Sequence, residues 1–209
     1  MFEGRAFKNN SKVLVKFMNR YIVAITGASG SILGIKIVKE LLNHAEVHLV
    51  ISHQAFDVIN HEIGLSWQKD NLDSIRQYFD SDRLFIHDNL NLSAPISSGS
   101  FITNGMFIVP CSMKTLSAVA NGYANNLISR AADVIIKEGR RLLIAPREMP
   151  FSPIHLENMS KLSRFDVVIA PPNPAFYHNP KTIDEVIGYM TGKMLDLMGV
   201  DNDHFKRWE

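Results

Sequence analysis

The sequence lacks the features that mark secreted, membrane-spanning or metal-binding proteins. It has one cysteine in 209 residues, Cys111, so no disulfide bond can form within the chain and a cytoplasmic location is predicted. It contains no continuous run of about eighteen apolar residues, which excludes a membrane-spanning helix. It has no C-x-x-C pair, and His61-Glu62 is followed by Leu65 where a zinc-binding helix would carry a second histidine. We therefore predict no metal site.

An excess of charge of either sign is also absent. Lysine and arginine total 22, aspartate and glutamate total 21, and the formal net charge is +1 at pH 7. Proteins that bind nucleic acid or an anionic membrane by bulk electrostatics need a strongly basic surface, so neither partner is expected. Any anion-binding site in this chain must be local.

The first 20 residues are basic and precede the first convincing strand. Their apolar stretch is too short for a secretory signal, so we read residues 1–20 as an N-terminal tail that is not part of the core. An organellar presequence is the alternative interpretation. Residues 21–209 contain no linker, internal repeat or low-complexity tract, and they are predicted to form a single domain.

Short apolar runs rich in β-branched residues alternate with segments of helical period. The runs are mostly continuous, which is typical of strands covered on both faces, as in a parallel sheet. They occupy residues 21–25, 47–51, 106–109, 142–145 and 167–170. The stretch 64–101 is less regular and is assigned only loosely. The pattern predicts a Rossmann-like, flavodoxin-related α/β fold, with a doubly wound parallel sheet in three α/β/α layers.

Ligands of such sheets bind beyond the carboxyl ends of the strands. The loops at those ends are rich in polar residues: GASGS (27–31), SHQ (52–54), PCSMKT (110–115), PREMPFS (146–152) and PPNPAFYHNPKT (171–182). We therefore look for the chemistry of the protein in these loops.

The first of these loops is a glycine-rich turn between a strand and an amphipathic helix. Backbone N–H groups and the helix dipole at such a turn can face an anion such as a phosphate. A tight turn with no ligand is the alternative interpretation. The next strand ends in Ser52-His53 rather than in an acid that would bind a ribose, and Glu46 lies at its opposite end. A mononucleotide such as FMN therefore fits better than NAD.

The loop PCSMKT offers hydroxyl groups, Lys114 and the N–H groups of a helix start, which suit a phosphate or the edge of a flavin. An ordinary helix cap with an exposed lysine is the alternative. In the helical stretch 126–138, Arg130 and Lys137 lie on one face with Asp133 between them. Without further information, this spacing favours a series of solvent-exposed ion pairs along the helix.

Arg147 and Glu148 follow a buried strand and stand between two prolines. Such placement suits anion binding with general acid or base chemistry, and a structural ion pair is the alternative. The aromatic residues in 171–180 could shield a site from water, or the prolines there could simply stiffen a surface connection.

Taken together and in this order, GASGS, PCSMKT, SRAADVIIKE, PREMPFSPIHLENM and PAFYHNPKTIDEVIGYMTGKMLD closely resemble the UbiX family of flavin prenyltransferases, formerly described as aromatic acid decarboxylases. The resemblance covers roughly residues 20–209. It implies an enzyme that joins a dimethylallyl group from dimethylallyl monophosphate to N5 and C6 of reduced FMN, without a metal. It also implies a homo-oligomer, commonly a dodecamer with sites completed across subunits, whose product serves UbiD-type decarboxylases.

The resemblance further implies a role for particular residues. The positions that match the family's FMN-binding residues are Gly27, Ala28, Ser29, Ser52, Ser112, Met113, Lys114, Thr115 and Arg147. Those that match its substrate contacts are Tyr177 and Lys193, with Arg130 and Lys137 in the same phosphate cluster and Glu62 and Trp208 as further site positions. Glu148 matches the acid/base that handles the proton at ring closure, and Ser29 a hydroxyl beside the flavin.

The sequence departs from the family pattern at two positions: it has His53 where lysine is common and Lys193 where arginine is common. With these residues, fewer bidentate hydrogen bonds to the phosphate are expected. Two other enzyme classes share part of this pattern. A cysteine decarboxylase would carry a PxMNxxMW segment, which is absent. A short-chain dehydrogenase would explain TGASG and the YxxxK pattern of Tyr189 and Lys193, but too little chain follows Lys193. A non-catalytic FMN carrier is the non-enzyme alternative.

Overall fold

The computed structural model describes residues 18–207. The strands are β1 (Asn19–Ile25), β2 (Ala45–Ile51), β3 (Leu84–Asp88), β4 (Gly105–Cys111), β5 (Arg141–Pro146) and β6 (Val168–Ile169). The helices are α1 (Ser31–Leu42), α2 (His53–Ile63), α3 (Asp73–Phe79), α4 (Met113–Ala120), α5 (Leu127–Lys137), α6 (Pro153–Ser163) and α7 (Ile183–Leu197), with a short 3-10 helix η1 (Pro95–Ser97).

The strands form one sheet in the order β3-β2-β1-β4-β5-β6, and every neighbouring pair is parallel. This is the order of the doubly wound dinucleotide-binding fold, and the order that remains without edge strand β3 is that of flavodoxin-like sheets. The predicted Rossmann-like, flavodoxin-related fold is therefore confirmed. Because the strand order reverses between β1 and β4, a ligand crevice is expected at their carboxyl ends.

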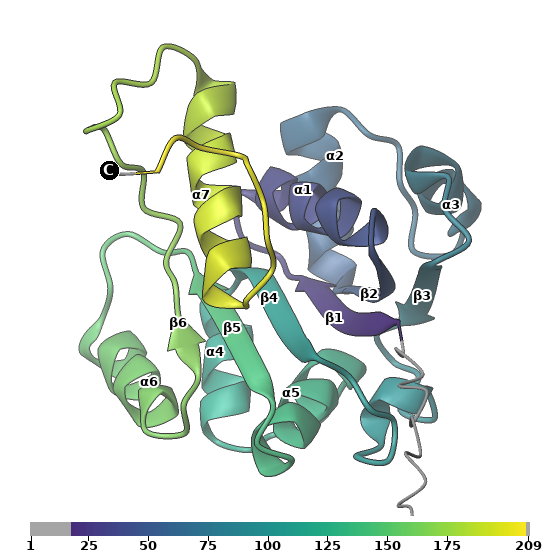
Figure 1. Cartoon of the computed structure of the whole chain (residues 1–209). Coiled ribbons are helices and arrows are strands. Elements are labelled where there is room, and N and C mark those ends of the chain that lie inside the picture. Colours follow the sequence, from purple (N-terminus) through teal and green to yellow (C-terminus); the bar gives the residue numbers. More distant parts are fainter. Residues whose placement is uncertain (1–17, 208–209) are drawn as a thin grey trace, which may run out of the picture.

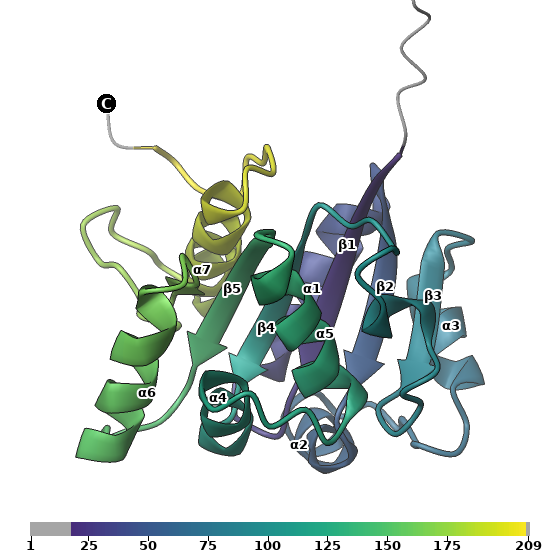
Figure 2. The same cartoon turned by 90° about the horizontal axis from the view of Figure 1, so that it is seen from below.

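Helices cover both faces of the sheet, as Figures 1 and 2 show. Successive β1 residues point to opposite faces, so Tyr21 and Val23 pack with α1, α2, α3 and α7, whereas Ile22 and Ala24 pack with α4, α5, α6 and η1. Strands buried on both sides need continuous apolar sequence, which explains the runs found above.

Two features differ from the sequence-based expectation. Strand β3 lies in the loosely assigned stretch, because its residues LFIHD include a histidine and an aspartate and it is only partly buried at the sheet edge. Strand β1 begins at Asn19, before the predicted end of the tail at residue 20. Asn19 pairs with Ala45, and the Arg20 side chain forms an ion pair with Glu46 and stacks on Phe101. The rest of the predicted tail, residues 1–17, lies outside the described residues.

Candidate functional site

A cavity of about 240 Å³ opens at the carboxyl edge of the sheet, close to the reversal of strand order. It is lined by Gly27, Ser52, Gln54, Asn89, Ser112, Lys114, Thr115, Asn126 and Ile128. The loops after β1, β2 and β4 thus meet here, as the sequence predicts. Because the sequence predicts an FMN site at this edge, we call this cavity the cofactor pocket for that expectation.

Hydrogen bonds hold these loops in register. The buried Thr26 hydroxyl donates to the Pro110 carbonyl at 2.9 Å and accepts from the Ser112 N–H at 2.7 Å. The Ser52 N–H donates to the Ile25 carbonyl at 3.0 Å, and the Arg147 N–H to the Cys111 carbonyl at 3.1 Å. The ends of four adjacent strands are therefore fixed relative to one another. Thr26 was not singled out from the sequence, since a threonine at the end of a strand carries no distinctive signal.

The start of α4 faces the cofactor pocket with its polar groups in place. Ser112 caps the helix, because its hydroxyl oxygen accepts from the Thr115 N–H at 3.3 Å and its O–H donates to the Thr115 hydroxyl at 3.2 Å. Lys114 is exposed beside it, and Met113 packs with its partly buried side chain against the core. The helix cap and a phosphate site are compatible here, because a cap satisfies only one of the first N–H groups of the helix.

The glycine-rich turn differs from the expectation of an open anion site. The backbone N–H groups of Gly30 and Ser31 donate to the Glu62 carboxylate at 3.1 Å, and the Ser31 hydroxyl donates to it at 2.7 Å. The start of α1 therefore does hold an anion, and that anion is a carboxylate from α2. Partial burial acts to raise the pKa of Glu62, but hydrogen bonds from Ser29, Ser31 and these N–H groups outweigh burial and lower it.

The same turn is packed closely against the start of α2. A Cβ atom on Gly27 would lie 2.8 Å from the Cβ of Gln54, so a larger residue would push the two loops apart. The Ala28 N–H donates to the Thr26 carbonyl at 2.7 Å. Ser29 contacts Glu62 through its hydroxyl. Of the three predicted residues of this turn, Gly27 therefore lines the cofactor pocket, whereas Ser29 contacts Glu62.

Three polar residues of the cofactor pocket were missed by the sequence analysis, namely Gln54, Asn89 and Asn126. Asn89 is 8% exposed and anchors the start of α5: its carbonyl accepts from the Leu127 N–H at 2.8 Å and its Oδ1 from the Ile128 N–H at 3.1 Å. Asn89 follows β3, which the pattern did not reveal, whereas Asn126 could have been recognised as the cap before α5.

Arg147 and Glu148 lie exposed immediately after β5. No ion pair joins them within residues 18–207, so the structural pair weighed above is not formed there. One Glu148 oxygen accepts from the Met149 N–H at 3.1 Å. Both side chains are therefore available at the carboxyl edge of the sheet.

Arg130 and Lys137 lie on α5, against the segment 97–101. Arg130 donates to the Ser97 carbonyl at 3.1 Å and pairs with Asp133 at 2.7 Å. Lys137 pairs with Glu138 rather than with Asp133, so the predicted series of ion pairs forms only in its first half. The separation of seven positions between the two cations corresponds to about 10 Å along the helix.

Tyr177 and Lys193 lie on the other side of the sheet. Tyr177 belongs to the segment between β6 and α7 and is 53% exposed, and Lys193 is exposed on α7. Because α5 and α7 cover opposite faces, one chain does not bring the four predicted phosphate contacts together. Trp208, also predicted to contribute, lies outside the described residues.

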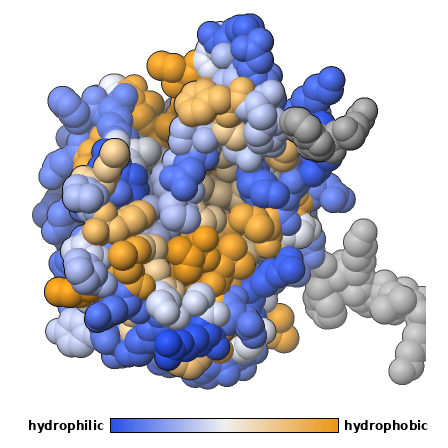
Figure 3. All heavy atoms as spheres, turned by 90° about the vertical axis from the view of Figure 1, so that its left-hand side faces the viewer, coloured by the Kyte–Doolittle hydropathy of each residue, from blue (hydrophilic) through white to orange (hydrophobic). Residues whose placement is uncertain are grey.

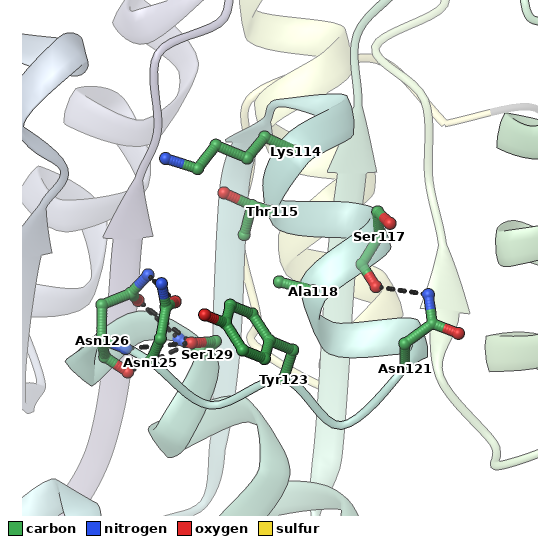
Figure 4. A pocket seen from close by; sticks show the side chains of 9 residues that line it. All are labelled: Lys114, Thr115, Ser117, Ala118, Asn121, Tyr123, Asn125, Asn126 and Ser129. Atoms are coloured by element: carbon green, nitrogen blue, oxygen red, sulfur yellow. Dashed lines mark hydrogen bonds between the residues drawn. The ribbon is translucent and has the colours of Figure 1, made fainter.

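A second cavity of about 280 Å³ adjoins the cofactor pocket and shares Lys114, Thr115 and Asn126 with it. Figure 4 shows its amide and hydroxyl groups, with the Tyr123 ring between Asn125 and Asn121. Within residues 18–207, no group of three or more His, Cys, Asp and Glu side chains is placed to hold a metal ion. No helix in this range is long and apolar enough to cross a membrane.

Comparison with known proteins gives consistent relatives. The pattern of the family described as Flavoprotein matches residues 10–197. The flavin prenyltransferase UbiX of Methanocaldococcus jannaschii is 46% identical over 189 residues, which cover 90% of this chain and 98% of that protein. A probable UbiX-like flavin prenyltransferase of Escherichia coli is 43% identical over 192 residues, 91% of this chain and 93% of that protein.

Solved structures agree with these sequences. A UbiX crystal structure in complex with FMN and dimethylallyl pyrophosphate matches with a TM-score of 0.84 and 43% identity, over 92% of this chain and 98% of that one. A dodecameric FMN-dependent UbiX-like decarboxylase from Escherichia coli matches with a TM-score of 0.83 and 43% identity, over 91% of this chain and 99% of that one. A peptidyl-cysteine decarboxylase at 20% identity and a TM-score of 0.55 shares the fold alone.

Proposed function

The chain belongs to the UbiX family of flavin prenyltransferases, and on that premise we propose that it transfers a dimethylallyl group from dimethylallyl monophosphate to N5 and C6 of reduced FMN. The observation that carries this proposal is the match to a relative whose crystal structure holds FMN together with dimethylallyl pyrophosphate, combined with a pocket lined by hydroxyl, amide and lysine side chains at the reversal of strand order. The residue assignments below are part of the proposal.

The cofactor pocket suits the phosphate and ribityl parts of FMN. Its lining supplies hydroxyl groups from Ser52, Ser112 and Thr115, the cation of Lys114 and side-chain amides, with Ile128 as its one apolar side chain. An anion there would be stabilised by the first N–H groups of α4 and by Lys114. Gly27 lines the same pocket, and Ala28, Met113 and Arg147 are proposed as further FMN contacts in the adjoining loops. When bound, reduced FMN supplies the nucleophilic N5 and C6 atoms.

Arg130, Lys137, Tyr177 and Lys193 are proposed to hold the allylic phosphate. As the carbon–oxygen bond breaks, the leaving phosphate gains negative charge, which cationic side chains and a phenol stabilise without a metal. Since α5 and α7 lie on opposite faces of the sheet, we place α5 of one subunit beside α7 of another, so that the site is completed between copies.

The surface beside β6 supports such an assembly. Figure 3 shows apolar groups gathered on this face of the molecule. The exposed apolar side chains of α6 and of the segments that follow it are Ile154, Leu156, Phe165, Phe176 and Ile183. A contiguous apolar patch on a soluble protein commonly marks a protein interface. We propose a homo-oligomer, and a dodecamer as in the Escherichia coli relative.

Glu148 is proposed to take the proton released when the second bond closes the ring, with Ser29 and Glu62 at the turn beside the flavin. Glu148 is exposed at the strand end and makes no ion pair within residues 18–207, so its carboxylate is available to accept a proton. Glu148→Gln keeps the size of the side chain but removes its basicity. The variant is expected to bind FMN and release phosphate yet to stall before ring closure, and unimpaired closure would refute this role.

The product is proposed to serve a UbiD-type decarboxylase in the cytoplasm, in ubiquinone synthesis or in aromatic acid breakdown. The chain gives no sign of an oxidising compartment, because its one cysteine, Cys111, has no partner for an intrachain disulfide. We propose residues 21–209 as the single FMN-binding domain, extended at its start by Asn19 and Arg20 of β1.

Release of phosphate tests the proposal. Purified protein is mixed without oxygen with reduced FMN and dimethylallyl monophosphate, and inorganic phosphate is followed with time. Release that requires reduced FMN is expected, and oxidised FMN is the control. A non-catalytic FMN carrier or an FMN-dependent decarboxylase would bind the flavin but release no phosphate.

A further inference from the structure

Thr26 follows β1 directly, at the point of the sheet where the order of strands reverses. The regular pairing of β1 with β4 ends at Ala24 and Ile108, and the pairing of β4 with β5 is irregular between Ile108 and Cys111. Beyond Ala24 and Ile108, each strand leads into its own helix. The position of the loop after β1 relative to the loop after β4 therefore depends on contacts outside the regular ladder.

The Thr26 hydroxyl supplies two such contacts. It donates to the Pro110 carbonyl at 2.9 Å and accepts from the Ser112 N–H at 2.7 Å. The direction of both bonds is fixed, because a carbonyl can only accept and an N–H can only donate. Thr26 is 1% exposed, so removing its hydroxyl would leave the Ser112 N–H without this acceptor at a site that is closed to solvent.

Both loops that Thr26 joins contribute to the cofactor pocket. Gly27, the next residue along the chain, lines the pocket on one side. On the other side, Ser112 caps α4 and lines the pocket together with Lys114 and Thr115. Thr26 itself is not part of the lining. One buried hydroxyl thus holds the start of α4 against the end of β1 from behind the pocket.

We propose that Thr26 is a positioning residue for FMN, whose hydroxyl holds Ser112 and the first turn of α4 in place for the phosphate group. The inference rests on the proposed function and goes beyond it, because it assigns part of cofactor recognition to a residue that does not contact the cofactor. Helix N–H groups and hydroxyl groups bind a phosphate by short, directional hydrogen bonds, so a small displacement of α4 weakens them. Riboflavin has the same ring and ribityl chain but no phosphate, and its binding should depend much less on Thr26.

The dissociation constants of FMN and riboflavin, measured by fluorescence titration of each variant, test this inference. Thr26→Val keeps the shape of the side chain and removes the hydroxyl. We expect the FMN constant to rise about 3- to 10-fold, the range of one lost hydrogen bond, and the riboflavin constant to change less than about 2-fold. Thr26→Ser keeps the hydroxyl and loses a methyl group, so its FMN constant should stay within about 2-fold of the wild type.

Two controls separate positioning from general stability, and Tm is measured for every variant. Ile75→Val removes a buried methyl group from α3, which lies outside the lining of the cofactor pocket. Thr103→Val removes a buried hydroxyl that has no hydrogen-bond partner within residues 18–207 and that precedes β4, at the amino edge of the sheet. Both controls should bind FMN as the wild type does.

Three results would overturn the inference: an unchanged FMN constant in Thr26→Val, an equal loss of affinity for FMN and riboflavin, or the same loss in Thr26→Ser. The hydrogen bond is also measurable in the wild type, where the Ser112 amide hydrogen should exchange slowly in the absence of flavin. Rapid exchange would contradict the bond even if Thr26→Val did not fold. Failure of the wild type to bind FMN would instead overturn the proposed function.

Discussion

Lowering the pH from about 7.5 to about 5 is expected to destabilise the protein through two hydrogen-bonded histidines, one on the edge strand β3 and one on its neighbour β2. His48 is 3% exposed, and its Nε2 lies 2.8 Å from Glu46 Oε1 while its Nδ1 lies 2.8 Å from His87 Nε2. Glu46 can only accept, so His48 donates from Nε2 and accepts at Nδ1 from the His87 N–H. Both rings are then neutral.

Burial, and to a smaller extent the nearby His48, lowers the pKa of His87 to about 4. An unfolded histidine has a pKa of about 6.5, so between these values the unfolded chain binds more protons than the native one. Stability therefore rises with pH through this window and is complete above it. At pH 5 the native state is expected to lose about 2 kcal/mol relative to neutral pH through this residue.

Urea unfolding at the two pH values, at one fixed protein concentration, measures this loss. His87→Gln cannot ionise, yet its amide N–H₂ group can still donate to His48, so the variant should lose about 2 kcal/mol less than the wild type between the two pH values. His61→Gln, on the exposed face of α2, is the matched control and should behave as the wild type. Equal pH dependence in His87→Gln and wild type would refute the reasoning.

Three further predictions concern packing and the cofactor pocket. Asn89→Ala leaves the Ile128 N–H without its acceptor, so we expect a loss of about 1–3 kcal/mol in urea unfolding and weaker FMN binding, whereas unchanged values would contradict its anchoring role. Gly34→Ala would place a Cβ atom 2.2 Å from the Val109 carbonyl oxygen, so a drop in Tm is expected, and an unchanged Tm would show that α1 can shift freely. Ser112→Ala removes the cap of α4, so it should cost about 1 kcal/mol and weaken FMN binding in a fluorescence titration, and retention of full affinity would argue against a phosphate at this helix.

The order of strands and helices was largely accessible from the sequence, because strands buried on both faces need continuous apolar residues. The end of α7 carries a sequence signal, because Gly199 follows the helix with a φ of 73°, a backbone conformation that favours glycine. Strand β3 was not readable, because half of its pairing surface is an exposed edge and its polar residues hide the pattern. The start of β1 was placed late because Arg20 looked like part of a basic tail, whereas its charge is balanced by Glu46 on the neighbouring strand.

The candidate site was accessible in part. Motifs in the strand-end loops identified Ser52, Ser112 and Thr115, since parallel strands bring their carboxyl ends to one edge. Contacts between distant segments were not accessible, such as Asn89 against α5 and Glu62 at the start of α1. The sequence of the turn shows that its N–H groups could bind an anion. Only the folded structure shows that the Glu62 carboxylate accepts their hydrogen bonds.

The mass of the flavin tests the central claim most directly. Protein is incubated without oxygen with reduced FMN and dimethylallyl monophosphate, and the extracted flavin is examined by mass spectrometry. A gain of one five-carbon prenyl unit is the predicted result. An unchanged flavin mass, with FMN bound and several prenyl donors tried, would contradict the assignment of this chain as a flavin prenyltransferase.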